Sequence, residues 1–163
     1  MYFRGSGNWN RTHACLDPAT NAQSYQKSFP IPPFSVHRLT VDNLLVFGNR
    51  NRDKDYLFQS EWEDYSRSDR LSVLLAFSRD GPADEKKTYV QDVILRDGGA
   101  WVYDALIRRS GMVFIAGSSG KMPQGVKDSV VEIIRAEEGI STEEAARKLA
   151  VIEKDGRWKQ ETW

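Results

Sequence analysis

The chain has 163 residues, of which 40% are hydrophobic and 11% aromatic, so it can bury the core of one ordinary domain. Lys plus Arg equals Asp plus Glu at 23 each, and a net charge of zero does not favour nucleic acid or an anionic membrane as a partner. The sequence has no apolar run near the roughly 20 residues of a membrane span, no signal-peptide core and only one cysteine, Cys15, so we expect no internal disulfide and a reducing, cytoplasmic setting.

The first 42 residues are rich in structure-breaking residues. Pro18, Pro30, Pro32 and Pro33 fall here, and no helical or alternating pattern lasts more than a few positions. We predict that residues 1–42 are irregular, apart from a short extended piece at 36–41. Both histidines also lie here without ligand spacing around them, so no metal site is expected.

From residue 43 onward, short apolar runs alternate with helical patterns. The runs at 44–47, 71–77 and 112–116 predict buried strands, and 157–162 predicts a final extended strand. Strands that alternate with helices are typical of an α/β fold with a parallel sheet. We therefore predict one α/β domain over residues 43–163.

Five helical segments connect these strands. One is predicted to begin at Asp55, with Phe58, Trp62 and Tyr65 on its inner face. Two short helices follow, the first ended by Gly98–Gly99. Two longer helices come next: one has Pro123 in its first turn and ends at Gly139, and the other opens with the capping box Ser141–Glu144.

Three predicted strands end in polar or basic clusters: Gly48–Arg50, Ser78–Arg79 and Gly117–Gly120. Ligands of open parallel sheets bind beyond the carboxyl ends of the strands, so these ends predict an anion site. An arginine just past a strand suits the 2′-phosphate of NADP, where an acidic residue would suit NAD. Taken alone, Ser78–Arg79 could be an ordinary strand exit, and Arg50–Arg52 a solvated surface.

Residues 43–163 also carry a set of strings in a recognisable order. On the strings 47–56, 76–80, 87–92, 114–117 and the aromatic end 161–163, this part of the chain resembles the C-terminal NADPH-binding part of diflavin reductases. These enzymes belong to the ferredoxin–NADP reductase superfamily, and the resemblance implies a doubly wound parallel sheet. Within the family, the likeness is greatest to the cytosolic branch that passes electrons to the iron–sulfur assembly machinery.

The resemblance implies a set of contacts at the adenosine end of NADPH. Ser78 and Arg79 would hold the 2′-phosphate, and Lys87 would add positive charge. Tyr89 would stack on the adenosine or form a hydrogen bond near it, supported by Gln91. A phosphate dianion needs cations and hydroxyl donors, and Ser78–Arg79 provides both.

The resemblance also implies contacts toward the nicotinamide. Arg50 would lie near the diphosphate or the adenosine ribose, and Ser118 and Met122 would line the nicotinamide side. Glu161 occupies the place of an acidic residue near the hydride path. Trp163 would cover the FAD ring until nicotinamide displaces it, because a terminal indole can stack and swing away; taken alone, it could also be a frayed terminal aromatic.

One family feature is missing from this sequence. The family has a strand and a Gly-x-Gly-x-x-Pro turn before the strand at 44–47, but no glycine occurs between Gly7 and Gly48. The flavin-binding barrel and the FMN domain are also absent. We therefore expect a fragment or altered product of a larger reductase, with two sheet halves, exposed edges and weak stability. A catalytically inert truncated product, or a reductase of the cytochrome or sulfite-reductase flavoprotein type, stays open.

Overall fold

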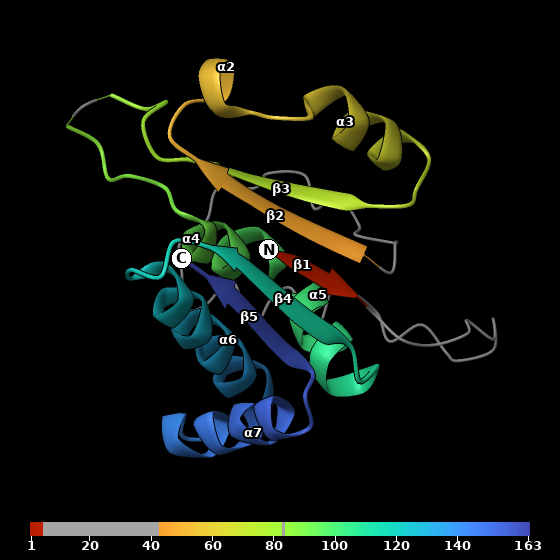
Figure 1. Cartoon of the computed structure of the whole chain (residues 1–163). Helices are drawn as coiled ribbons and strands as arrows, with labels where there is room; N and C mark the ends of the chain where they lie inside the picture. Colours follow the sequence, from red (N-terminus) through yellow and green to blue (C-terminus); the bar gives the residue numbers. More distant parts are fainter. Residues whose placement is uncertain (5–42, 83) are drawn as a thin grey trace.

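The computed structural model describes residues 1–4, 43–82 and 84–163, which form a five-stranded sheet in the order β3-β2-β1-β4-β5 (Figure 1). The strands are β1 (Tyr2–Arg4), β2 (Asn43–Asn49), β3 (Ser72–Phe77), β4 (Met112–Gly117) and β5 (Trp158–Thr162). β2 and β3 run parallel, as do β4 and β5. The three strands predicted from apolar runs and the predicted final extended strand are therefore confirmed.

β1 occupies the centre of the sheet and runs antiparallel to both neighbours. Phe3 pairs with Leu44 on one side and with Val113 on the other, and the Val46 amide donates to the Met1 carbonyl at 2.8 Å. The prediction of two separate sheet halves is wrong, because three residues expected to be irregular join the two parallel pairs. The sheet is also mixed rather than wholly parallel. The piece at 36–41 lies outside the described residues.

The main core lies on one face of this sheet. Leu44 and Val46 of β2 alternate in burial with their neighbours, and Val113 and Ile115 of β4 do the same. Phe3 is completely buried, and its ring meets the ring of Trp101 edge-on, with the centroids 6.1 Å apart. The central strand thus contributes an aromatic anchor to the core as well as backbone pairing.

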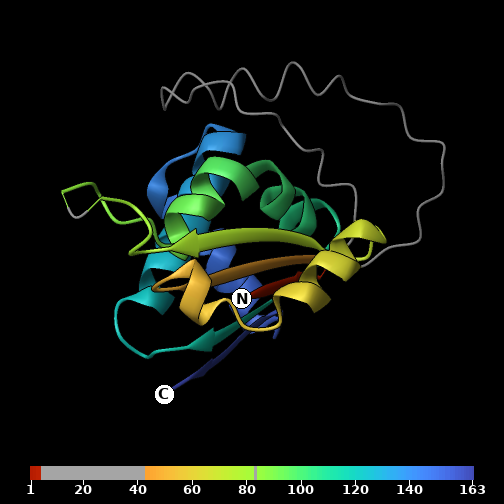
Figure 2. The ribbon, with the colours of Figure 1, turned by 90° about the horizontal axis from the view of Figure 1, so that it is seen from above.

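The helices occupy both sides of the sheet. Their bounds are α2 (Arg52–Asp55), α3 (Gln59–Arg67), α4 (Val90–Val93), α5 (Gly99–Tyr103), α6 (Met122–Glu138) and α7 (Thr142–Lys154), with π-helical turns η1 (Ile94–Gly98) and η2 (Asp104–Arg108). Figure 2 shows the green stretch from α4 to η2 on one side of the sheet, and α2 with the start of α3 on the other. No helix among the described residues is long and apolar enough to cross a membrane.

The predicted helix stop at Gly98–Gly99 is wrong. Helical structure continues through both glycines, which are buried. A Cβ atom at Gly98 would lie 3.0 Å from the Leu74 Cδ1 atom of β3, closer than ordinary van der Waals contact. Here the glycine serves close packing of the helix on the sheet, which sequence alone cannot distinguish from a stop signal.

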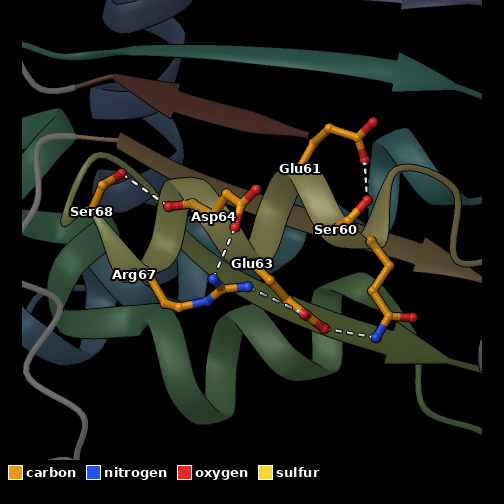
Figure 3. A network of polar contacts seen from close by, with 7 residues as sticks. Ser60, Glu61, Glu63, Asp64, Arg67 and Ser68 are labelled. Atoms are coloured by element: carbon orange, nitrogen blue, oxygen red, sulfur yellow. Dashed lines mark hydrogen bonds and ion pairs between the residues drawn. The ribbon is translucent and has the colours of Figure 1, made fainter.

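The predicted inner face of the helix after Asp55 is also wrong. The segment breaks at Phe58, which has a left-handed φ of 59°, and α3 begins only at Gln59. Phe58 and Tyr65 are 63% and 46% exposed, and their rings contact Trp62 rather than the core. The charges of α3 are largely paired within the helix, where Arg67 lies 3.0 Å from Asp64 (Figure 3).

The two C-terminal helices match their predictions. Pro123 lies in the first turn of α6, and Gly139 ends that helix with a left-handed φ of 65°. At the start of α7 the Glu144 amide donates to Ser141 Oγ at 3.2 Å, and the Ser141 amide donates to Glu144 Oε2 at 3.0 Å. Both termini therefore follow from local side-chain and backbone chemistry.

Replacing Phe3 with alanine tests whether β1 holds the sheet together. Because this ring is fully buried at the centre, we expect Phe3→Ala to lower the free energy of unfolding by about 3–5 kcal/mol. Denaturant unfolding followed by circular dichroism measures the change. Leu57→Ala, at a side chain 59% exposed, is the control and should change stability by no more than about 0.5 kcal/mol. Equal effects of the two substitutions would contradict the central position of β1.

Candidate functional site

A pocket of about 580 Å³ lies at the carboxyl ends of β2 and β3. It is bounded by these two strand ends, by the start of α4 and by the start of α6. Its lining residues are Gly48, Asn49, Arg50, Ala76, Ser78, Thr88, Tyr89, Val90, Gln91, Lys121 and Met122. The position matches the general rule for ligand sites in α/β sheets.

Backbone hydrogen bonds hold the two strand exits side by side. The Ser78 amide donates to the Asn49 carbonyl at 3.0 Å, and the Arg79 amide donates to the Arg50 carbonyl at 2.8 Å. The Asn51 side-chain amide returns a bond to the Arg79 carbonyl at 3.2 Å. Arg50, Ser78 and Arg79 come from loops almost 30 positions apart and meet here because β2 and β3 are parallel neighbours.

The start of α4 brings Tyr89 and Gln91 to the pocket. The Tyr89 amide donates to Asp92 Oδ2 at 2.9 Å, which satisfies one of the free amides of the first turn. Val90 packs directly over Gly48, where a Cβ atom would lie 2.3 Å from Val90 Cγ1. The glycine after the apolar part of β2 is therefore what allows α4 to approach this strand.

The start of α6 forms the remaining wall. Ser129 donates its hydroxyl to the Gln91 carbonyl at 3.3 Å, and a Cβ atom at Gly125 would lie 3.4 Å from the Gln91 Cδ atom. These contacts hold α6 close against α4. As a result Lys121 and Met122, at the end of the loop after β4, reach the pocket beside residues that follow β2 and β3.

Five of the residues expected to bind cofactor line this pocket: Arg50, Ser78, Tyr89, Gln91 and Met122. Two further predicted residues do not line it. Arg79 and Lys87 are exposed and directly adjoin the lining residues Ser78 and Thr88 in the chain. Of the predicted adenosine-end residues, Arg50, Ser78, Tyr89 and Gln91 thus share one pocket.

The other three predicted residues form a separate group at the ends of β4 and β5. Glu161 pairs with Ala116 in the sheet, and the Trp163 amide donates to the Gly117 carbonyl at 3.2 Å. The Trp163 carbonyl accepts from the Ser119 amide at 2.9 Å, next to Ser118, while the indole is 76% exposed. The backbone of the terminal residue is fixed and its ring is presented to solvent.

Met122 connects the two groups. It lines the pocket, and its Cε atom would lie 3.1 Å from a Cβ atom at Gly117. Gly117 has a φ of 143°, which residues with a side chain rarely adopt. Both this backbone angle and the close approach of Met122 favour glycine at this position. The pocket and the β4–β5 end are therefore neighbouring parts of one surface.

The charged residues that line the pocket, Arg50 and Lys121, are both cations. Arg50, Arg79, Lys87 and Lys121 have no carboxylate within ion-pair distance among the residues that the structure describes. The pocket lining itself contains no Asp or Glu. Such an arrangement fits a phosphate-bearing ligand. Within the described ranges no group of His, Cys, Asp and Glu could hold a metal ion.

Two polar pocket residues, Thr88 and Lys121, were not expected from the sequence. Thr88 adjoins the predicted residue Tyr89, so a signal for it was present. Lys121 had a weaker signal, because its only distinction is its place between a strand-ending loop and a predicted helix. Its approach to Arg50 depends on how α6 packs.

Comparison with known proteins gives the same class of fold and site. The family described as "Oxidoreductase NAD-binding domain" matches residues 35–128, and the chain belongs to this family. Relatives named "NADPH-dependent diflavin oxidoreductase 1" include those of Schizosaccharomyces pombe (43% identical over 75% of this chain), Emericella nidulans (39% over 90%) and Mycosarcoma maydis (40% over 82%). The matches cover 20%, 22% and 21% of these relatives, so the chain spans about a fifth of their length. The resemblance noted from the sequence is confirmed.

Gly48→Ala tests whether the close approach of α4 builds the pocket. The added methyl group would overlap Val90, so we expect a loss of about 1–3 kcal/mol in unfolding free energy and a displaced Tyr89. Denaturant unfolding and the fluorescence of a nucleotide analogue would show the two effects. Gly120→Ala is the matched control, because the nearest atom to its added Cβ would be 3.7 Å away. A Gly48→Ala variant as stable as the control would contradict this role.

Proposed function

We propose that this chain is the NADPH-binding part of a diflavin oxidoreductase. The observation that carries this proposal is the pocket at the carboxyl ends of β2 and β3, which has cations, hydroxyls and amides around it and no carboxylate in its lining. The names of the relatives support the choice of NADPH and of a flavoprotein. In the intact enzyme, NADPH supplies a hydride and FAD accepts it.

Recognition of the 2′-phosphate is assigned to the exit of β3. Ser78 can donate a hydroxyl hydrogen bond, and Arg79 can bind two phosphate oxygens through its planar guanidinium group. Lys87 adds a third positive or donating group from the loop before α4. The backbone bond between Arg79 and Arg50 keeps the β3 exit beside the β2 exit, where the rest of the adenosine would lie.

The adenosine itself is assigned to the wall formed by α4. Tyr89 is 46% exposed at the pocket, so its ring is available to stack on a base or to donate its hydroxyl. Gln91 lies behind it and is packed against α6 at Gly125, which fixes its direction. Arg50 completes this end of the site as a contact for the ribose or the diphosphate.

The nicotinamide end is assigned to the surface formed by β4, β5 and the start of α6. Ser118 and Met122 would line it, and Glu161 would place a carboxylate near the path of the hydride. Trp163 would stack on the flavin ring when no nicotinamide is bound, because its side chain is exposed while its backbone is hydrogen-bonded to Gly117 and Ser119. These residues would therefore orient the reactants at the nicotinamide end.

Several properties are proposed for the intact protein rather than for this chain. The flavin-binding barrel for FAD and the FMN domain would belong to the other four-fifths of the length seen in the relatives. The complete NADP-binding domain would have a doubly wound sheet, and the enzyme would be cytoplasmic. Electrons would leave through FMN to an acceptor protein of cytosolic iron–sulfur assembly.

Arg79→Ala tests the 2′-phosphate assignment in the chain as it stands. Loss of a charge-assisted contact should weaken binding of 2′,5′-ADP by about 10- to 100-fold and leave 5′-ADP nearly unchanged. Calorimetric titration measures both dissociation constants. Arg70→Ala, at an exposed arginine just before β3, is the control and should bind both nucleotides normally. Failure of the unsubstituted chain to bind 2′,5′-ADP would instead favour the inert truncated product.

Trp163→Ala in the intact reductase tests the stacking role of the C-terminal residue. Without an indole to displace, less binding energy from the 2′-phosphate is needed, so NADH should be used much better relative to NADPH. The ratio of kcat/KM for the two cofactors is the measurement. Trp62→Ala on α3 removes an indole distant from the site and should leave the ratio unchanged. An unaltered ratio in Trp163→Ala would remove this residue from the proposal.

A further inference from the structure

The centre of the sheet is incomplete at the edge where the pocket lies. The pairs of β1 end with Tyr2, which is opposite Leu45 and Phe114. β2 continues to Asn49 and β4 to Gly117 beyond that point. Because β1 runs antiparallel to its neighbours, its carboxyl end at Arg4 lies toward the opposite edge. It therefore brings no strand-to-helix turn to the pocket.

This geometry matters for a ligand that contains a diphosphate. In dinucleotide-binding folds, the backbone amides of a turn after the central strand bind this group. Among the described residues no turn after the central strand adjoins the pocket, and the strand-to-helix turn that reaches it is 117–120, between β4 and α6. The first turns of α4 and α6 also line the pocket, but backbone amides carry only partial charge, so cationic side chains would be the strongest donors to a diphosphate bound here.

Lys121 is positioned to supply such a donor. It lines the pocket from the side of α6, opposite the strand ends that carry Arg50. Its carbonyl accepts from the Gly125 amide at 3.0 Å, so its backbone is fixed to the first turn of the helix. Its ammonium group has no carboxylate within ion-pair distance in the described part of the chain. By contrast, Lys127 of the same helix lies 2.6 Å from Glu153.

We infer that Lys121 binds the diphosphate of the dinucleotide from the start of α6. The inference rests on the proposed function and adds a residue to the same site. Arg50 from β2 and Lys121 from the β4–α6 loop would approach the diphosphate from two sides. Affinity for the bridging phosphates then depends on side-chain charge, whereas the 2′-phosphate depends on the β3 exit.

Two ligands that differ in the diphosphate separate the contribution of Lys121 from that of the β3 exit. The full chain and its Lys121→Ala variant are titrated calorimetrically with 2′-AMP, which lacks the diphosphate, and with 2′-phospho-ADP-ribose, which contains it. We expect Lys121→Ala to weaken binding of 2′-phospho-ADP-ribose about tenfold and to leave 2′-AMP within twofold. Lys121→Arg should restore most of the lost affinity. Lys154→Ala, at an exposed lysine ending α7, is the control for general loss of positive charge.

The outcomes distinguish failure of this inference from failure of the proposed function. Unchanged binding of 2′-phospho-ADP-ribose in Lys121→Ala overturns the role of Lys121, and the proposed function stands if Arg79→Ala still impairs both ligands. Equal weakening of both ligands by Lys121→Ala also overturns it, because the effect would then be general electrostatics. If the unsubstituted chain binds neither ligand, the proposed function itself fails. Thermal unfolding without ligand verifies that each variant is folded.

Discussion

The antiparallel pairing of three residues, Tyr2–Arg4, is the contact on which the rest of the structure depends. It joins a β2–β3 unit to a β4–β5 unit, and neither unit pairs directly with the other in the sheet. The pocket needs both, because Arg50 and Ser78 follow the first unit and Lys121 follows the second. Phe3 strengthens the join by burying its ring against Trp101. Nonetheless a ladder of three residues is short, and the low stability expected from the sequence stays a prediction.

The pocket owes its shape to close packing at small residues and its chemistry to unpaired charge. Gly48 admits Val90, so α4 can reach the end of β2. Gly125 admits Gln91, so α6 can reach α4. The charged residues lining this pocket are cations, and the lining contains no carboxylate. On α3, by contrast, the carboxylate of Asp64 pairs with Arg67. An exposed ion pair such as Arg67–Asp64 says little about function, whereas pocket cations that lack a carboxylate partner are available to a bound anion.

The altered centre of the sheet changes how an anion can be held. Backbone amides of a turn act at fixed positions and carry only partial charge, whereas lysine and arginine side chains carry full charge and move. A site that relies on the second kind of donor is more sensitive to ionic strength and loses more side-chain entropy on binding. The proposal that the β3 exit binds the 2′-phosphate and Lys121 binds the diphosphate follows from this difference.

Much of this architecture could be predicted from local sequence. The apolar runs of β2, β3 and β4 and the capping box at Ser141 depend on neighbours a few positions away, and so do the predicted site residues at the strand exits.

Other features depend on contacts between distant segments. Three residues are too few to show a strand period, so the central place of Tyr2–Arg4 could not be read from their pattern. Phe58 is exposed because its backbone is left-handed. Helical structure continues through Gly98 because the glycine packs closely on Leu74. Lys121 lines the pocket because of the way α6 packs. The sequence by itself determined the elements and the chemistry at their ends, because both are local. Only the tertiary structure decided which ends share a pocket, because burial and register are set by long-range packing.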